Sequence, residues 1–137
     1  CKRVCPEYGV PVSVWAWKQG VSGKIFSVFS NGIKAAAAMG AKVVVVNSGS
    51  CEYGVPFEEA VKGPAELLNR LGRVAGQEGV TMAIESLTAD ETNIADNLKH
   101  TKELIRQADT PSLKAMADTV AIYFAGETFR GMVSGFW

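Results

Sequence analysis

Two carboxylates follow directly after two short apolar runs of the sequence. Glu85 comes after Val80–Ile84, and Asp118, 33 residues further on, comes after Leu113–Ala117. Continuous apolar runs of this length are typical of strands buried on both faces of a parallel sheet. Because ligands bind at the carboxyl ends of such strands, both acids are expected at the same edge of the sheet, where a ligand would bind. Their oxygens suit a hard divalent cation such as Mg²⁺ or Mn²⁺. An equally good account from the residues alone is that they solvate loops or cap the following helices.

Three further residues could contact a small-molecule ligand. Asn47 follows the apolar run Lys42–Val46, where its amide could bind a substrate or simply form a turn. Trp15 and Trp17 lie two residues apart, which places both indoles on one face of a strand. These rings could stack on a sugar near the strand end or pack in a core. The segment Ser48–Ser50 lacks the glycine spacing of a phosphate-binding loop.

The remaining reactive side chains favour structural roles. His100 is the only histidine, and its position in the middle of a helical pattern indicates a surface residue, since ligands in parallel βα folds come from strand ends. Glu127 is expected to cap a following helix through the helix dipole. Cys51 would need a basic partner to act as a nucleophile, and the sequence offers no histidine for that role. Because Cys1, Cys5 and Cys51 contain no CxxC pair, free thiols in a reducing compartment such as the cytoplasm are expected.

Length and charge argue against several classes of protein. The chain has 137 residues, which suits a single domain. Fourteen basic and 14 acidic residues give a formal net charge of zero, which argues against a nucleic-acid binder with a basic face. The longest strongly apolar run, Val43–Val46, is too short to span a bilayer, so no membrane partner is expected. An apolar content of 47% with balanced charge excludes intrinsic disorder.

The elements that must position these residues alternate between strands and helices. Four apolar runs predict strands over Pro11–Trp17, Lys42–Val46, Val80–Ile84 and Leu113–Ala117. Apolar residues at helical spacing predict helices over Asn31–Met39, over Phe57–Glu78 with a break at Gly63-Pro64, and over Ile94–Ala108 with Asn93 as N-cap. A last helix is expected to begin near Thr128. This alternation implies parallel βα crossovers and fits either a small doubly wound sheet or about four units of an eight-fold βα barrel.

Two segments of this α/β pattern resemble a known enzyme family. GVTMAIESLTADETN (Gly79–Asn93) and SLKAMADTVAIYFAGETF (Ser112–Phe129) are similar to the sugar phosphate isomerase/epimerase family, which has a xylose isomerase-like TIM barrel. Within it, ketose 3-epimerases and fructoselysine 3-epimerase-like members are the nearest in pattern. AAAAMGAKVVVVNSG and PVSVWAW look like the segments around the fourth and third strands of that barrel. The resemblance implies that residues 1–137 form a single incomplete domain, a partial (β/α)8 TIM barrel of about four βα units that resemble strands three to six.

The resemblance also implies roles for three acids. Glu85 and Asp118 match the Glu and Asp that end the fifth and sixth barrel strands and bind a divalent metal, commonly Mn²⁺, Mg²⁺ or Co²⁺. Glu91, six residues after the first of these acids, matches a glutamate that contacts substrate. The family takes its remaining metal ligands, a His and a Glu, from the seventh and eighth strands, which the resemblance places outside this chain. Ala121 stands where several ketose 3-epimerases have a substrate-binding His.

The reaction that the resemblance implies is epimerisation or isomerisation of a sugar or sugar phosphate. Removal of a proton next to the sugar carbonyl gives an enediolate that the metal stabilises, and Glu85 is then both metal ligand and general base. Two bases on opposite faces permit epimerisation, whereas a single base permits aldose–ketose isomerisation. Glu91, Asn47 and Trp15 are the expected substrate contacts. This chain alone is expected to be inactive, and the longer protein could form a homo-oligomer.

Two other classes of protein fit parts of the sequence. An endonuclease IV-like DNA repair enzyme uses a related barrel, but it needs several histidines for zinc ions and a face that binds DNA. This chain has one histidine and a net charge of zero. A non-catalytic, flavodoxin-like binding domain would explain the length of the chain. It would give no reason for the pairing of Glu85 with Asp118.

Overall fold

The computed structural model describes residues 4–5, 10–11, 22–128 and 130, and a parallel sheet of three strands lies at its centre. These strands are β3 (Val43–Val46), β4 (Thr81–Glu85) and β5 (Leu113–Met116), arranged in the order β3-β4-β5. Both neighbouring pairs are parallel, and each strand falls on an apolar run that predicts one. Apart from its first residue, the predicted strand Pro11–Trp17 lies outside the described residues.

Helices connect the strands as βα crossovers. The described helices are α1 (Ser22–Ala38), α2 (Phe57–Ala60), α3 (Lys62–Gln77), α4 (Leu98–Ala108) and α5 (Thr119–Phe124), and a short antiparallel pair joins β1 (Val4–Cys5) to β2 (Val10–Pro11). Helices α2 and α3 link β3 to β4, and α4 links β4 to β5. The predicted α/β class, a partial (β/α)8 barrel, is therefore confirmed. Within the described ranges, no helix combines the length and the apolar character needed to cross a bilayer.

The start of α4 differs from its prediction. The helix begins at Leu98, and its N-cap is Asn97, whose side chain accepts a hydrogen bond from the His100 N–H at 2.9 Å. The prediction that Asn93 caps a helix from Ile94 is wrong. The Asn93 side chain is instead bound to the backbone of Cys51, 42 residues away, and the chain continues as a loop until Asn97.

Two other helix boundaries also depart from the predictions, and one short helix was not predicted. Helix α1 starts well before the predicted Asn31, and Pro64 lies inside the first turn of α3, where its missing N–H removes no intrahelical hydrogen bond. The sequence pattern does not predict α5, because six residues are too few to show a helical period. The helix expected near Thr128 falls almost entirely on residues outside the described part of the chain.

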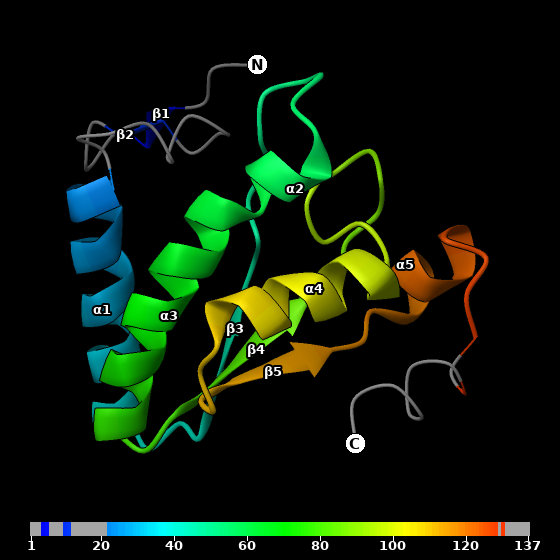
Figure 1. Cartoon of the computed structure of the whole chain (residues 1–137). Coiled ribbons are helices and arrows are strands. Elements are labelled where there is room, and N and C mark those ends of the chain that lie inside the picture. Colours follow the sequence, from blue (N-terminus) through cyan, green and yellow to red (C-terminus); the bar gives the residue numbers. More distant parts are fainter. Residues whose placement is uncertain (1–3, 6–9, 12–21, 129, 131–137) are drawn as a thin grey trace.

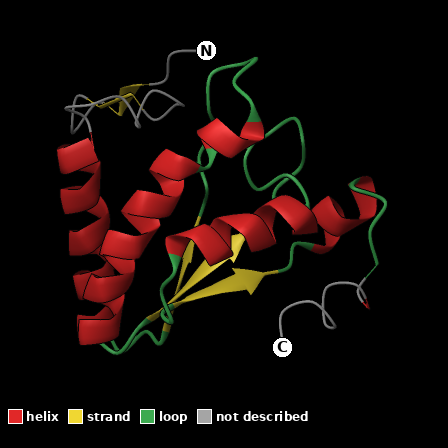
Figure 2. Ribbon diagram, in the orientation of Figure 1, coloured by secondary structure: helices red, strands yellow, loops and turns green. Residues whose placement is uncertain are grey.

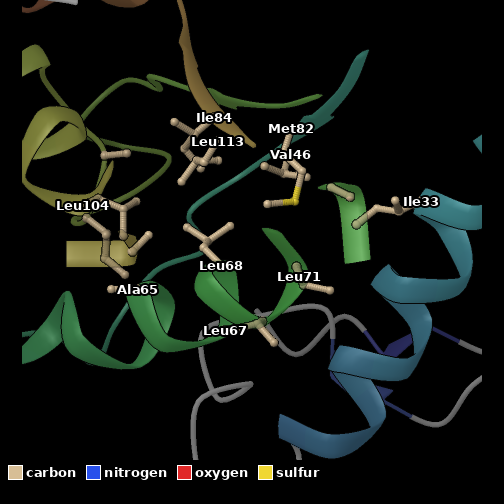
Figure 3. Close-up of a cluster of buried hydrophobic side chains, with 14 of the residues drawn as sticks. Ile33, Val46, Ala65, Leu67, Leu68, Leu71, Met82, Ile84, Leu104 and Leu113 are labelled. Atoms are coloured by element: carbon tan, nitrogen blue, oxygen red, sulfur yellow. The ribbon is translucent and has the colours of Figure 1, made fainter. Parts of the chain in front are cut away.

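The hydrophobic core lies between the sheet and the helices α1, α3 and α4, which cover one of its faces (Figure 1). Alternate residues of the strands face this core, as the period of a β-strand requires. Figure 3 shows strand residues opposite helix residues across this layer, among them Val46, Met82, Ile84 and Leu113 from the strands and Leu68, Leu71 and Leu104 from the helices. Full burial of each large aliphatic side chain stabilises the fold by roughly 1.5–3 kcal/mol.

None of the described helices covers the opposite face of the sheet (Figure 2). Val43 and Val45 of β3 point to it and are 56% and 49% exposed, whereas Val46, on the helix side, is 3% exposed. In a closed βα barrel this second face lines the barrel interior, and its upper rim holds the ligand. Candidate functional residues should therefore lie on this face, at the carboxyl ends of the strands.

Gly72 provides a stability prediction where α3 packs against the turn after α4. A Cβ atom on this buried residue would lie 2.2 Å from Oγ1 of Thr110. Because the clash outweighs the roughly 1 kcal/mol of helix propensity that alanine adds, we expect Gly72→Ala to lower the free energy of unfolding by about 1–3 kcal/mol, measured by urea denaturation. Gly76→Ala is the matched control, since its Cβ would meet only Ser112 Oγ, at 3.0 Å. Equal stability of the two variants would contradict the prediction.

Candidate metal and substrate site

The carboxyl ends of β4 and β5 bring two acidic side chains to one edge of the sheet. Glu85 is the last residue of β4 and lies opposite Met116 of β5. Residues paired across parallel strands point to the same face, which here is the face turned away from the helices. Asp118 follows two residues after Met116 with an extended backbone (φ −91°, ψ 121°) and is the N-cap of α5. Both acids therefore lie at the carboxyl ends of neighbouring strands, at one edge of the sheet.

Asp118 also has a structural role, because it is the N-cap of α5. Its Oδ1 accepts hydrogen bonds from the N–H of Val120 at 2.7 Å and from the N–H of Ala121 at 3.4 Å. Within the described part of the chain, its second oxygen takes part in no hydrogen bond. Helix capping, the alternative account from the residues, is therefore present, and it leaves Oδ2 free to bind a ligand.

Glu85 is half-buried, and its carboxylate has no hydrogen-bond or ion-pair partner among the described residues. Partial burial of a carboxylate without a partner is unfavourable, and local features that oppose stability concentrate at functional sites. Two carboxylates with unengaged oxygens fit a hard divalent cation by the chemistry of their donors. They form only part of a metal site, since the residues described contain no group of three or more His, Cys, Asp or Glu side chains that could hold an ion.

The three candidate substrate contacts have different surroundings. Asn47 directly follows Val46, whose partner on β4 is Ile84, so Asn47 comes next to Glu85 in the register of the sheet. Glu91 lies in the loop after β4, at the same end of the strands. Its Oε2 accepts hydrogen bonds from the Thr88 N–H at 3.0 Å and from the Thr88 hydroxyl at 2.7 Å, which closes a short turn. Trp15 lies outside the described residues.

His100 differs from the expected mid-helix surface residue. Because α4 begins at Leu98, the histidine lies in the first turn, where its ring stacks on Phe57 of α2 with centroids 3.8 Å apart and an interplanar angle of 13°. Its Nδ1 is 2.6 Å from Oδ1 of Asp96, and the side chain is 27% exposed. The imidazole therefore joins α2 to α4 within the helix layer.

Two other acids, Glu127 at the start of α4 and Glu103 within it, are also engaged in structural contacts. Both carboxylate oxygens of Glu127 accept a hydrogen bond from the Leu98 N–H, at 3.0 and 3.1 Å. Glu127 thus caps α4, because the chain after α5 returns past the start of that helix. The following helix that it was predicted to cap falls almost entirely outside the described residues. Hydrogen bonds from Arg106 and Gln107 lower the pKa of Glu103 to about 2. These acids are therefore occupied and add nothing to the rim of the sheet.

Sequence comparison assigns the chain to a family. Residues 2–132 match the family described as “xylose isomerase-like TIM barrel”. The chain therefore belongs to this family. The parallel strands joined by helices are the arrangement that such a barrel requires. Among curated proteins, none matches the sequence.

Solved structures of two 3-epimerases and of the IolI protein share the fold. A D-psicose 3-epimerase from Clostridium cellulolyticum H10, crystallised with D-tagatose, has a TM-score of 0.79 at 13% identity over 90% of this chain and 44% of that one. The IolI protein with a bound zinc atom has a TM-score of 0.69 at 17% identity over 84% and 41% of the two chains. A D-allulose 3-epimerase from Methylomonas sp. has a TM-score of 0.70 at 18% identity over 86% and 41%. Such identities show the fold alone, and this chain spans less than half the length of these proteins.

Proposed function

We propose that the protein carrying this chain is a metal-dependent sugar or sugar phosphate isomerase/epimerase. The observation that carries the proposal is the pair of acids, Glu85 and Asp118, at the carboxyl ends of neighbouring strands of a xylose isomerase-like barrel. Two structural neighbours that are 3-epimerases of ketohexoses, and a third with a zinc atom, support the same choice. The free thiol of Cys51 fits a cytoplasmic enzyme.

In the proposed reaction, Glu85 is the general base. Its half-buried carboxylate takes the proton from the carbon next to the sugar carbonyl. In isomerisation the same carboxylate returns the proton to the neighbouring carbon, whereas in epimerisation a second base from outside this chain delivers a proton to the opposite face. Glu85 and Asp118 would also hold a divalent cation such as Mn²⁺, Mg²⁺ or Co²⁺, together with ligands from outside this chain. When bound, such a cation acts as a Lewis acid that stabilises negative charge on the sugar oxygens.

The remaining candidates orient the sugar at the rim. The Asn47 amide, beside Glu85 in register, is suited to donate a hydrogen bond to a sugar hydroxyl or carbonyl oxygen. Glu91 has one oxygen engaged by Thr88, which leaves the other to accept from a hydroxyl. Trp15 is proposed to stack on the sugar ring.

Proton exchange with solvent provides the test of this function. We expect the intact protein with Mn²⁺ in D₂O to place deuterium next to the carbonyl of ketohexoses such as D-psicose and D-tagatose, as followed by NMR. Deuterium at C3 indicates epimerisation, and deuterium at C1 indicates aldose–ketose isomerisation. The same protein treated with a chelator is the control and should give no exchange. Absence of exchange with these sugars and their phosphate esters, under Mn²⁺, Mg²⁺ and Co²⁺, would refute the proposal.

A further inference from the structure

Hydrogen bonds join the loop after β3 to the loop after β4, although the two are more than 40 residues apart in the sequence. Residues 48–51 of the first loop contact residues 91–93 of the second. We call this set of contacts the loop clasp. It lies at the carboxyl end of the strands, where the candidate site is, and the sequence pattern does not predict it.

The buried part of the loop clasp is a pair of hydroxyl groups. Ser48 and Thr92 are 1% and 3% exposed, and their oxygens are 3.2 Å apart. The Thr92 hydroxyl donates to the carbonyl of Gly49 at 2.6 Å and accepts from the N–H of Ile94 at 3.0 Å. Buried polar groups with satisfied hydrogen bonds specify one arrangement, because any shift would leave a donor or an acceptor unpaired.

Asn93 forms the second part of the loop clasp. Its Oδ1 accepts a hydrogen bond from the N–H of Cys51 at 2.8 Å, and its Nδ2 donates to the carbonyl of the same residue at 3.2 Å. One amide side chain thus satisfies both backbone groups of a residue in the neighbouring loop, as a paired strand would. The Ser50 hydroxyl adds a bond of 3.1 Å to the carbonyl of Glu91.

The loop clasp connects the two segments that carry candidate substrate contacts. Asn47 directly precedes Ser48, and Glu91 directly precedes Thr92. Glu85, in contrast, is held by the hydrogen-bond ladder between β4 and β5. We propose that Asn93 is a positioning residue that fixes the substrate-contacting rim, while the strand alone fixes the general base. This inference rests on the proposed function and adds to it the residue that sets substrate affinity indirectly.

The proposal predicts a separation of kinetic effects in the intact protein. We expect Asn93→Ala to raise KM for the ketose by about 10-fold or more and to change kcat by less than about 3-fold, because only the binding contacts move. Asn93→Asp keeps the acceptor for the Cys51 N–H and should recover part of this loss. Asn69→Ala is the matched control. The Asn69 amide also donates across the chain, to the carbonyls of Ala108 and Asp109, but at the amino end of the sheet, so KM should stay unchanged.

Amide hydrogen exchange tests the loop clasp without any substrate. We expect the Cys51 amide to exchange faster in Asn93→Ala and at the normal rate in Asn69→Ala. Two results would overturn the positioning role of Asn93 without affecting the proposed enzymatic function. The first is faster exchange of the Cys51 amide in Asn93→Ala with an unchanged KM. The second is an equal rise of KM in Asn93→Ala and Asn69→Ala. Faster exchange together with an inactive unmodified protein would count against the proposed function instead. If the Cys51 amide exchanges at the same rate in Asn93→Ala as in the unmodified protein, the hydrogen bonds of Asn93 do not hold the two loops together.

Discussion

Replacement of Glu85 by glutamine is expected to lower kcat for proton exchange at the sugar carbon by about 10²–10⁴-fold in the intact protein. Glutamine keeps the size and the hydrogen-bonding capacity of the side chain, but it cannot accept the proton. The carboxylate is half-buried at the end of β4 without a partner among the described residues, so no neighbouring group of this part of the chain replaces it. The measurement is kcat at saturating ketohexose with Mn²⁺.

Stability measurements separate this effect from misfolding. Because the Glu85 carboxylate has no stabilising partner in the described structure, Glu85→Gln should leave the melting temperature unchanged or raise it. Glu91→Gln is the matched control, and we expect it mainly to raise KM, since this acid lies in the loop and not at a strand end. Normal turnover by the Glu85→Gln variant would show that Glu85 is not the general base.

The strands and the two rim acids could be predicted because their signals are local. Each described strand of the parallel sheet coincides with an apolar run, and the three central residues of β4, Met82, Ala83 and Ile84, are all buried. Parallel pairing then carries the residues after two such runs to the same edge. The position of Glu85 and Asp118 follows from the two apolar runs and from the general tendency of βα units to form a parallel sheet, without knowledge of any particular side-chain contact.

The errors arose where a distant contact decides between local alternatives. Asn93 and Asn97 lie four residues apart, about one helical turn, so the pattern fits either as the N-cap of α4. The hydrogen bonds of Asn93 to Cys51, 42 residues earlier, settle the choice in favour of Asn97. The position of His100 then follows from the later start of the helix. Similarly, the capping of α4 by Glu127 depends on how the chain returns after α5, which no local pattern indicates.

Replacement of Asp118 is expected to separate its two roles, ligand and helix cap. Asp118→Asn keeps an oxygen that can accept from the N–H of Val120 but removes the charge that a hard cation requires. We expect this variant to weaken Mn²⁺ binding by about 100-fold or more, since loss of an outer-shell partner alone costs 10–100-fold, and to change the free energy of unfolding little. Asp118→Ala removes both roles and should in addition lower the free energy of unfolding by about 1 kcal/mol.

Isothermal titration of the intact protein with Mn²⁺ alone measures the first role, and urea unfolding without metal measures the second. The difference in unfolding free energy between Asp118→Asn and Asp118→Ala isolates the cap, because both variants lack the charge. The difference in Mn²⁺ affinity between the unmodified protein and Asp118→Asn isolates the ligand, because both keep an acceptor for α5. If Asp118→Asn binds Mn²⁺ as tightly as the unmodified protein, Asp118 is a helix cap only, and the metal must be held by other groups.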